Sequence, residues 1–138
     1  MSFIEWNEDK FSVKVAALDH DHQIIADLIS QFHDAHAAGK GPEILETIFG
    51  VLMDYTLSHF AREEALMEQA GYPDLADHRI GHEKLKSELG EMHARFVGGD
   101  EGVVLDMLAF LSNWWHFHIL EKDHAYIGSL AAKGLTDK

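Results

Sequence analysis

The chain has 138 residues, and its 24 Asp and Glu outnumber its 11 Lys and Arg, which gives a formal net charge of −13. This length predicts one domain. There is no Cys, which excludes disulfides, thiolate metal ligands and a Cys nucleophile. The acidic charge argues against a nucleic-acid partner, because affinity for phosphates depends on Lys and Arg. Eleven His are the unusual feature of the composition.

The N-terminal segment, residues 1–17, carries Glu5, Glu8 and Asp9 and has no long apolar run. We therefore expect neither a signal peptide nor a membrane span, and we expect a cytoplasmic protein that does not bind membranes. Residues 18–132 are expected to form a helical bundle, with residues 1–17 as an arm that lies across it. The apolar side chains of this arm are Phe3, Ile4, Trp6, Phe11 and Val13.

Gly and Pro cluster at 39–42, 71–73 and 98–100, so four long segments remain between them. In each segment apolar residues and His recur at steps of three and four, which is the period of a helix and not of a strand. Short connections make successive helices antiparallel. The sequence therefore predicts an all-α, up-down-up-down four-helix bundle, followed by a short C-terminal helix at 124–132.

Several residues indicate where the helices begin. Asp19 or Asp21 favours the start of the first helix, because acidic side chains stabilise a helix N-terminus. Pro42 suits the first position of the second helix. The fourth helix is expected to run from Asp100 to His118.

The predicted inward faces carry ionisable side chains among the apolar ones. His59 and Glu63, like His78 and His82, are four residues apart, which puts each pair on one helix face a single turn apart. An unpaired buried imidazole or carboxylate costs roughly several kcal/mol, so these groups must be satisfied together. The sequence therefore predicts a metal site with ligands from all four helices: His22, His59, Glu63, His78, His82, His118 and Asp123.

His118 and Asp123 do not fit a regular helix. They are five residues apart, which is about 140° around an ideal helix. They would share a face only through a long side-chain reach or a local distortion of the helix. The remaining histidines are expected to be solvated or to lie behind the ligands: His20, His33, His36, His93, His116 and His124.

The predicted ligands occur in the order H…HxxxE…HxxxH…HxxxxD, accompanied by Trp6, the Leu18–His22 segment and the Gly71–Pro73 turn. In this order and spacing the chain resembles the hemerythrins, in particular the single-domain bacteriohemerythrins, over nearly its whole length. The resemblance includes the five-residue spacing at the end. It implies one hemerythrin-like domain over residues 1–138, built around a non-haem di-iron site.

The resemblance also implies a role for each ligand. One iron would be held by three imidazoles: His78, His82 and His118. The other would be held by two: His22 and His59. Glu63, Asp123 and an oxo or hydroxo group would bridge the two Fe ions. The residue types alone would also accept Mn or Zn.

One coordination position would stay open, on the iron with two imidazoles, and apolar walls should surround it. By their offsets from the ligands the expected lining residues are Ile25, Phe60, Trp114, Trp115 and Ile119. Trp115 stands where many relatives have Leu, so its larger ring would narrow or redirect the access of a ligand.

The function implied is reversible dioxygen binding for storage, delivery or sensing, without catalysis, with an oxygen-consuming protein as the client. Two alternatives stay open. The first is a di-iron enzyme with peroxidase, oxidase or nitric-oxide reductase activity. The second is an iron-handling protein in which the metal mainly holds the bundle together.

Overall fold

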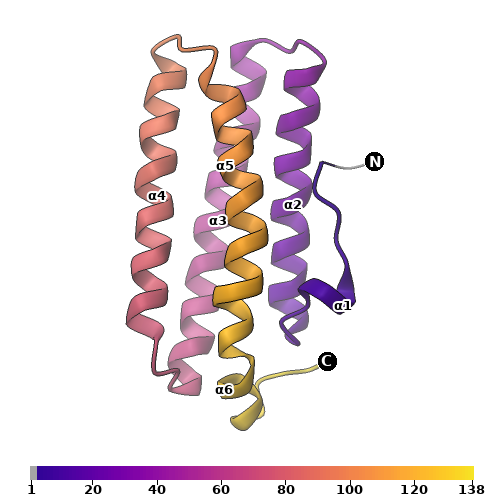
Figure 1. Cartoon of the computed structure of the whole chain (residues 1–138), viewed down its shortest axis with the longest axis vertical. Helices are drawn as coiled ribbons and strands as arrows, with labels where there is room; N and C mark the ends of the chain where they lie inside the picture. Colours follow the sequence, from indigo (N-terminus) through magenta and orange to yellow (C-terminus); the bar gives the residue numbers. More distant parts are fainter. Residues whose placement is uncertain (1–2) are drawn as a thin grey trace.

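Four long helices lie side by side in the computed structural model, which describes residues 3–138 (Figure 1). They are α2 (Ala16–Ala37), α3 (Pro42–Ala70), α4 (Leu75–Val97) and α5 (Val103–Phe117). Successive helices run in opposite directions because the turns between them are short. No strand occurs within residues 3–138. The predicted all-α, up-down-up-down bundle is confirmed.

Gly and Pro set the limits of α3. The helix begins at Pro42, whose missing N–H is not needed in the first turn. It ends at Gly71, which takes a left-handed conformation with φ of 64°, and the N–H of Tyr72 then donates to the carbonyl of Met67 over 3.0 Å. This pairing satisfies a carbonyl at the helix end and reverses the chain into α4.

The last helix of the bundle continues directly into three shorter helical segments. α5 continues into a π-helical turn (η1, His118–Asp123), a 3-10 turn (η2, His124–Tyr126) and a short helix, α6 (Ile127–Ala132). The segment 124–132 is thus helical as expected, with a tighter first turn. At its other end α5 begins at Val103, three residues after the predicted start.

The N-terminal arm runs along the bundle beside α2 (Figure 1). It contains a single helical turn, α1 (Glu8–Phe11), which the sequence pattern does not predict. Ala16 and Ala17, at the end of the predicted arm, already belong to α2. Residues 1 and 2 of that arm lie outside the described residues. The arm buries Ile4, Phe11, Val13 and Val15.

Two apolar clusters fill the interior. The larger one includes Ile25 of α2 and Phe60 of α3, together with Ile4 and Phe11 of the arm. The smaller one includes Leu18 of α2 and Met67 of α3, together with Tyr126. Along both helices, polar residues fall between the two clusters. The interior therefore has a polar layer near one end of the bundle.

Asp19 ties the arm and the C-terminal residues to this end of the bundle. Its buried carboxylate accepts hydrogen bonds from the Ser12 hydroxyl and, over 2.8 Å, from the Val13 N–H. The ammonium group of Lys138 lies 2.8 Å from the same carboxylate. One side chain in the first turn of α2 thus holds two segments that are far apart in sequence.

We predict that Asp19→Ala lowers the free energy of unfolding by roughly 3 kcal/mol, because it leaves the Val13 N–H and the Ser12 hydroxyl buried without an acceptor. Urea denaturation measures the change. Asp27→Ala on the exposed face of the same helix is the control and should change stability by about 0.5 kcal/mol or less. Equal losses in the two variants would contradict the role given to Asp19.

Candidate metal centre

Seven ionisable side chains meet in the polar layer, where α2 and α4 begin and α3 and α5 end. One comes from α2, two from α3, two from α4 and two from the π-helical turn that follows α5. All are buried, with exposed fractions of at most 9 %. They are the seven residues that the sequence singled out: His22, His59, Glu63, His78, His82, His118 and Asp123.

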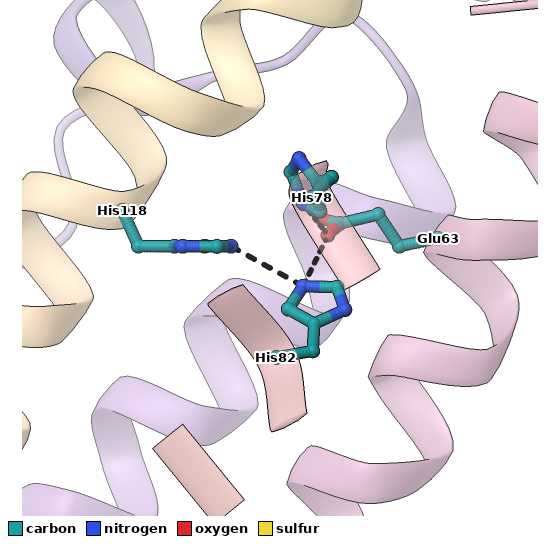
Figure 2. Close-up of side chains that lie close together, drawn as sticks. All are labelled: Glu63, His78, His82 and His118. Atoms are coloured by element: carbon teal, nitrogen blue, oxygen red, sulfur yellow. Dashed lines mark hydrogen bonds and ion pairs between the residues drawn. The ribbon is translucent and has the colours of Figure 1, made fainter. Parts of the chain in front are cut away.

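The ligand-type atoms form two groups, and within each group they lie within 4.8 Å of one another. The first group combines three imidazoles with one carboxylate: His78, His82, His118 and Glu63. Figure 2 shows the rings of His82 and His118 pointing toward each other, with their Nε2 atoms 3.3 Å apart. The second group combines two imidazoles with two carboxylates: His22, His59, Glu63 and Asp123.

Glu63 faces both groups at once. Its Oε1 lies 2.7 Å from Nε2 of His78 and 3.1 Å from Nε2 of His82. Its Oε2 lies 3.2 Å from Nε2 of His59. One carboxylate oxygen is therefore turned toward each group, an arrangement that allows a carboxylate to bridge two cations.

Asp123 reaches the site because the chain makes a π-helical turn over His118–Asp123. A π turn places residues five apart on the same face, so Oδ1 of Asp123 lies 3.1 Å from Nε2 of His118. Its Oδ2 lies 3.1 Å from Nε2 of His22 in the other group. The sequence left two explanations open, a long side-chain reach or a local distortion of the helix. The structure shows the local distortion.

The polar atoms of this layer leave hydrogen-bonding capacity unused. Within the described residues, the ring nitrogens of His22 and the carboxylate oxygens of Asp123 are buried and form no well-directed hydrogen bond, although Nε2 of His22 lies 3.1 Å from Oδ2 of Asp123. Buried polar groups are nearly always paired, and a cation between them would satisfy nitrogen and oxygen together. Imidazole and carboxylate donors without sulfur suit iron. The residues present therefore fit metal ions.

The electrostatics of the layer favour positive charge. Burial would lower the pKa of His22, but the contacts with Asp123 and Glu63 outweigh it and raise the pKa to about 9. The pKa of His78 is raised to about 9 by the same competition. Burial would raise the pKa of Glu63, yet the imidazoles facing it, His59 first, hold it well below its usual range. A bound cation would supply this positive charge while the imidazoles stay neutral.

Three more side chains support the ligands from behind, and the sequence pattern did not assign them to the site. Asp21 lies 2.9 Å from Nδ1 of His59, and Glu64 lies 2.8 Å from Nδ1 of His82. The Tyr126 hydroxyl donates to Oε2 of Glu63 over 3.0 Å. Each of these contacts joins two different segments, so no spacing within one helix could reveal it. Asp21 does not cap α2, which begins five residues earlier.

Other histidines have partners away from the two groups. His33 is paired with Asp34, and His93 lies 3.2 Å from Glu46. Backbone carbonyls lie within hydrogen-bond distance of two further histidines: Ser112 for His116 and Phe11 for His124.

Aromatic rings cover the layer on the side of the larger apolar cluster. The ring of Phe60 stacks on His82 with centroids 3.7 Å apart, and Trp114 stacks on His118 at 5.3 Å. The indole N–H of Trp115 donates to the backbone carbonyl of His22 over 3.0 Å. Of the five predicted lining residues, Trp114 is half-buried and the rest are buried: Ile25, Phe60, Trp115 and Ile119.

Comparison with known proteins agrees with this geometry. Residues 13–130 match the hemerythrin HHE cation binding domain. The chain belongs to the hemerythrin family. It is 32 % identical over 132 residues to the bacteriohemerythrin of Methylococcus capsulatus, a match that covers 96 % of this chain and 100 % of the relative. It is 34 % identical over 130 residues to the bacteriohemerythrin of Pseudomonas aeruginosa, covering 94 % and 83 %.

Solved hemerythrin structures have the same fold. The crystal structure of wild-type hemerythrin matches with a TM-score of 0.87 at 29 % identity, over 94 % of this chain and 99 % of that one. A point mutant of hemerythrin matches with a TM-score of 0.87 at 30 % identity, over 95 % and 99 %. Family and relatives together support a di-iron, oxygen-binding protein, and the family consists of oxygen-binding proteins rather than enzymes. Among residues 3–138 there is no helix with the length and apolarity needed to cross a bilayer.

We predict that His82→Ala lowers the metal content of this hemerythrin by at least one ion per chain, because its imidazole lies at the centre of the first group. His33→Ala, a change outside both groups, should lower it by none. Metal analysis of the purified variants measures both. Equal losses would overturn the ligand assignment.

Proposed function

We propose that this hemerythrin binds dioxygen reversibly at two iron ions per chain. In this proposal three imidazoles hold one iron: His78, His82 and His118. Two hold the other: His22 and His59. Glu63 and Asp123 bridge the irons together with an oxo or hydroxo group. The observation that carries the proposal is that each carboxylate turns one oxygen toward each group of imidazoles.

Counting ligands supports one vacancy. Two octahedral metals offer about twelve positions, of which five imidazoles would fill five, two bridging carboxylates four and one oxygen bridge two. The position that remains belongs to the metal with fewer imidazoles, beside His22 and His59. Iron bound here would supply electrons to a small diatomic ligand and take them back on release.

The side chains around that position would exclude water and external proton donors. We assign this role to the five buried or half-buried apolar residues named for the pocket: Ile25, Phe60, Trp114, Trp115 and Ile119. Trp115 is fixed to the backbone of His22 by its indole N–H, so its ring is held beside the two-imidazole side. The same side chains keep the site dry and pack the core.

We further propose that the protein carries oxygen and does not catalyse a reaction. Di-iron enzymes with ferritin-like bundles use a carboxylate-rich shell, whereas this cluster has five imidazoles and two carboxylates. The proposed role is storage, delivery or sensing of oxygen, with an oxygen-consuming client protein, in the cytoplasm.

The test is oxygen titration of the anaerobically reduced, iron-loaded protein. A visible charge-transfer band should appear with oxygen and disappear when oxygen is removed under argon, over repeated cycles. Irreversible oxidation in the first cycle, without such a band, would reject reversible binding.

A second measurement separates binding from catalysis. The iron-loaded protein is supplied with hydrogen peroxide or nitric oxide, and consumption is compared with the rate of autoxidation. We expect consumption to be no faster than autoxidation, because the vacancy is enclosed by apolar side chains. Sustained turnover well above that rate would instead identify an enzyme.

A further inference from the structure

Asp21 is the most heavily hydrogen-bonded carboxylate next to the metal centre. It lies on α2 and is buried, and every partner of its side chain comes from α3. Its Oδ2 lies 2.9 Å from Nδ1 of His59 and accepts a hydrogen bond from Nε of Arg62 over 2.9 Å. Its Oδ1 accepts hydrogen bonds from Nη2 of Arg62 and from the hydroxyl of Tyr55, both over 2.7 Å. The guanidinium and the phenol hold this carboxylate as an anion against His59.

Glu64 makes a parallel contact on the other group. Its Oε2 lies 2.8 Å from Nδ1 of His82, and its Oε1 accepts from Nε of Arg79 over 3.0 Å. The two carboxylates differ in burial, since the side chain of Asp21 is 4 % exposed and that of Glu64 is 25 % exposed. In each group, one imidazole thus contacts a carboxylate that is itself paired with an arginine. The carboxylate that contacts His59 is the more buried of the two.

These contacts determine which ring nitrogen faces the metal. A neutral imidazole has one N–H, and a carboxylate at Nδ1 requires that nitrogen to be the donor. Nε2 of His59 is then left as a lone-pair donor, and it lies on the side of Glu63, 3.2 Å from Oε2. A hydrogen bond to an anion also makes the ring more basic and fixes its orientation. The effect is larger where water is excluded.

We propose that Asp21 is a positioning residue that acts through His59 and stabilises the ferric state of the iron at the two-imidazole group. This inference rests on the proposed function, in which that iron carries the vacancy. Iron held here would supply electrons to bound dioxygen and take them back on release, so no other reductant would take part. By favouring the ferric state, Asp21 slows the release of oxygen. Glu64 has the weaker effect, because solvent screens it and its iron has no vacancy.

Asp21→Asn removes the charge and keeps the size of the side chain. In the iron-loaded protein we expect it to shift the ferric-to-ferrous equilibrium toward ferrous by at least tenfold, which is about 59 mV for a one-electron couple, and to speed oxygen release by a similar factor. The matched control, Glu64→Gln, should shift the equilibrium by less than about threefold. Potentiometric titration and stopped-flow oxygen dissociation measure the two effects.

Tyr55→Phe tests the mechanism without changing any charge. The Tyr55 hydroxyl donates a hydrogen bond to Asp21 and so weakens the interaction of this carboxylate with His59. Loss of the hydroxyl should strengthen that interaction and shift the ferric-to-ferrous equilibrium toward ferric, the opposite direction to Asp21→Asn. The exchangeable, iron-shifted N–H proton signal of His59 in the NMR spectrum of the reduced protein should move in both variants. The His82 signal should move only in Glu64→Gln.

The outcomes are distinct. Equal shifts in Asp21→Asn and Glu64→Gln, or shifts of the same sign in Asp21→Asn and Tyr55→Phe, would overturn the inference. If Asp21→Asn does not retain iron, the sign of the Tyr55→Phe shift decides. A wild-type protein that holds fewer than two irons, or that fails to release oxygen, would instead reject the proposed function.

Discussion

Burial of two carboxylates among five imidazoles is the constraint on which the rest of this structure depends. Burying one of these side chains alone in an apolar interior would cost roughly several kcal/mol of folding free energy. The hydrogen bonds among the seven side chains leave some of their nitrogen and oxygen atoms unpaired. Metal ions bound in the cluster would satisfy nitrogen and oxygen together. The fold supplies what such ions require, namely ligands fixed on four separate segments and a dry surrounding shell.

Much of this architecture follows from periodicity. Steps of three and four place His22 between Leu18 and Ile25 on one face of α2, and in the structure all three are buried. Gly71 and Pro42 mark helix limits for reasons of backbone conformation that do not depend on neighbours. For these reasons the bundle, its direction changes and the convergence of the seven candidate ligands could be predicted from the sequence. The assignment of residues 1–138 to one domain stays a prediction.

Other features depend on contacts between segments, and no pattern within one segment encodes them. Asp21 resembles a helix-start residue in the sequence, and only the approach of α3 turns it into the partner of His59 and Arg62. The π turn could be named as one of two possibilities but not chosen, because the choice depends on where Asp123 must reach. The turn α1 has four residues and no periodic signal of its own.

The position of the metal layer divides the bundle into unequal parts. All seven candidate ligands lie toward the end of the bundle where α2 and α4 begin, while the connections at 38–41 and 98–102 close the opposite end, which is packed mainly by the larger apolar cluster. The candidate metal site and the apolar half of the bundle are therefore separated along the long axis of the molecule. We expect volume-conserving exchanges in the half away from the site to change stability only slightly and to leave the site as it is, because substitutions more than about 7–10 Å apart usually act independently. That half is the natural place to lengthen a loop or attach a probe while the coordination geometry stays as it is.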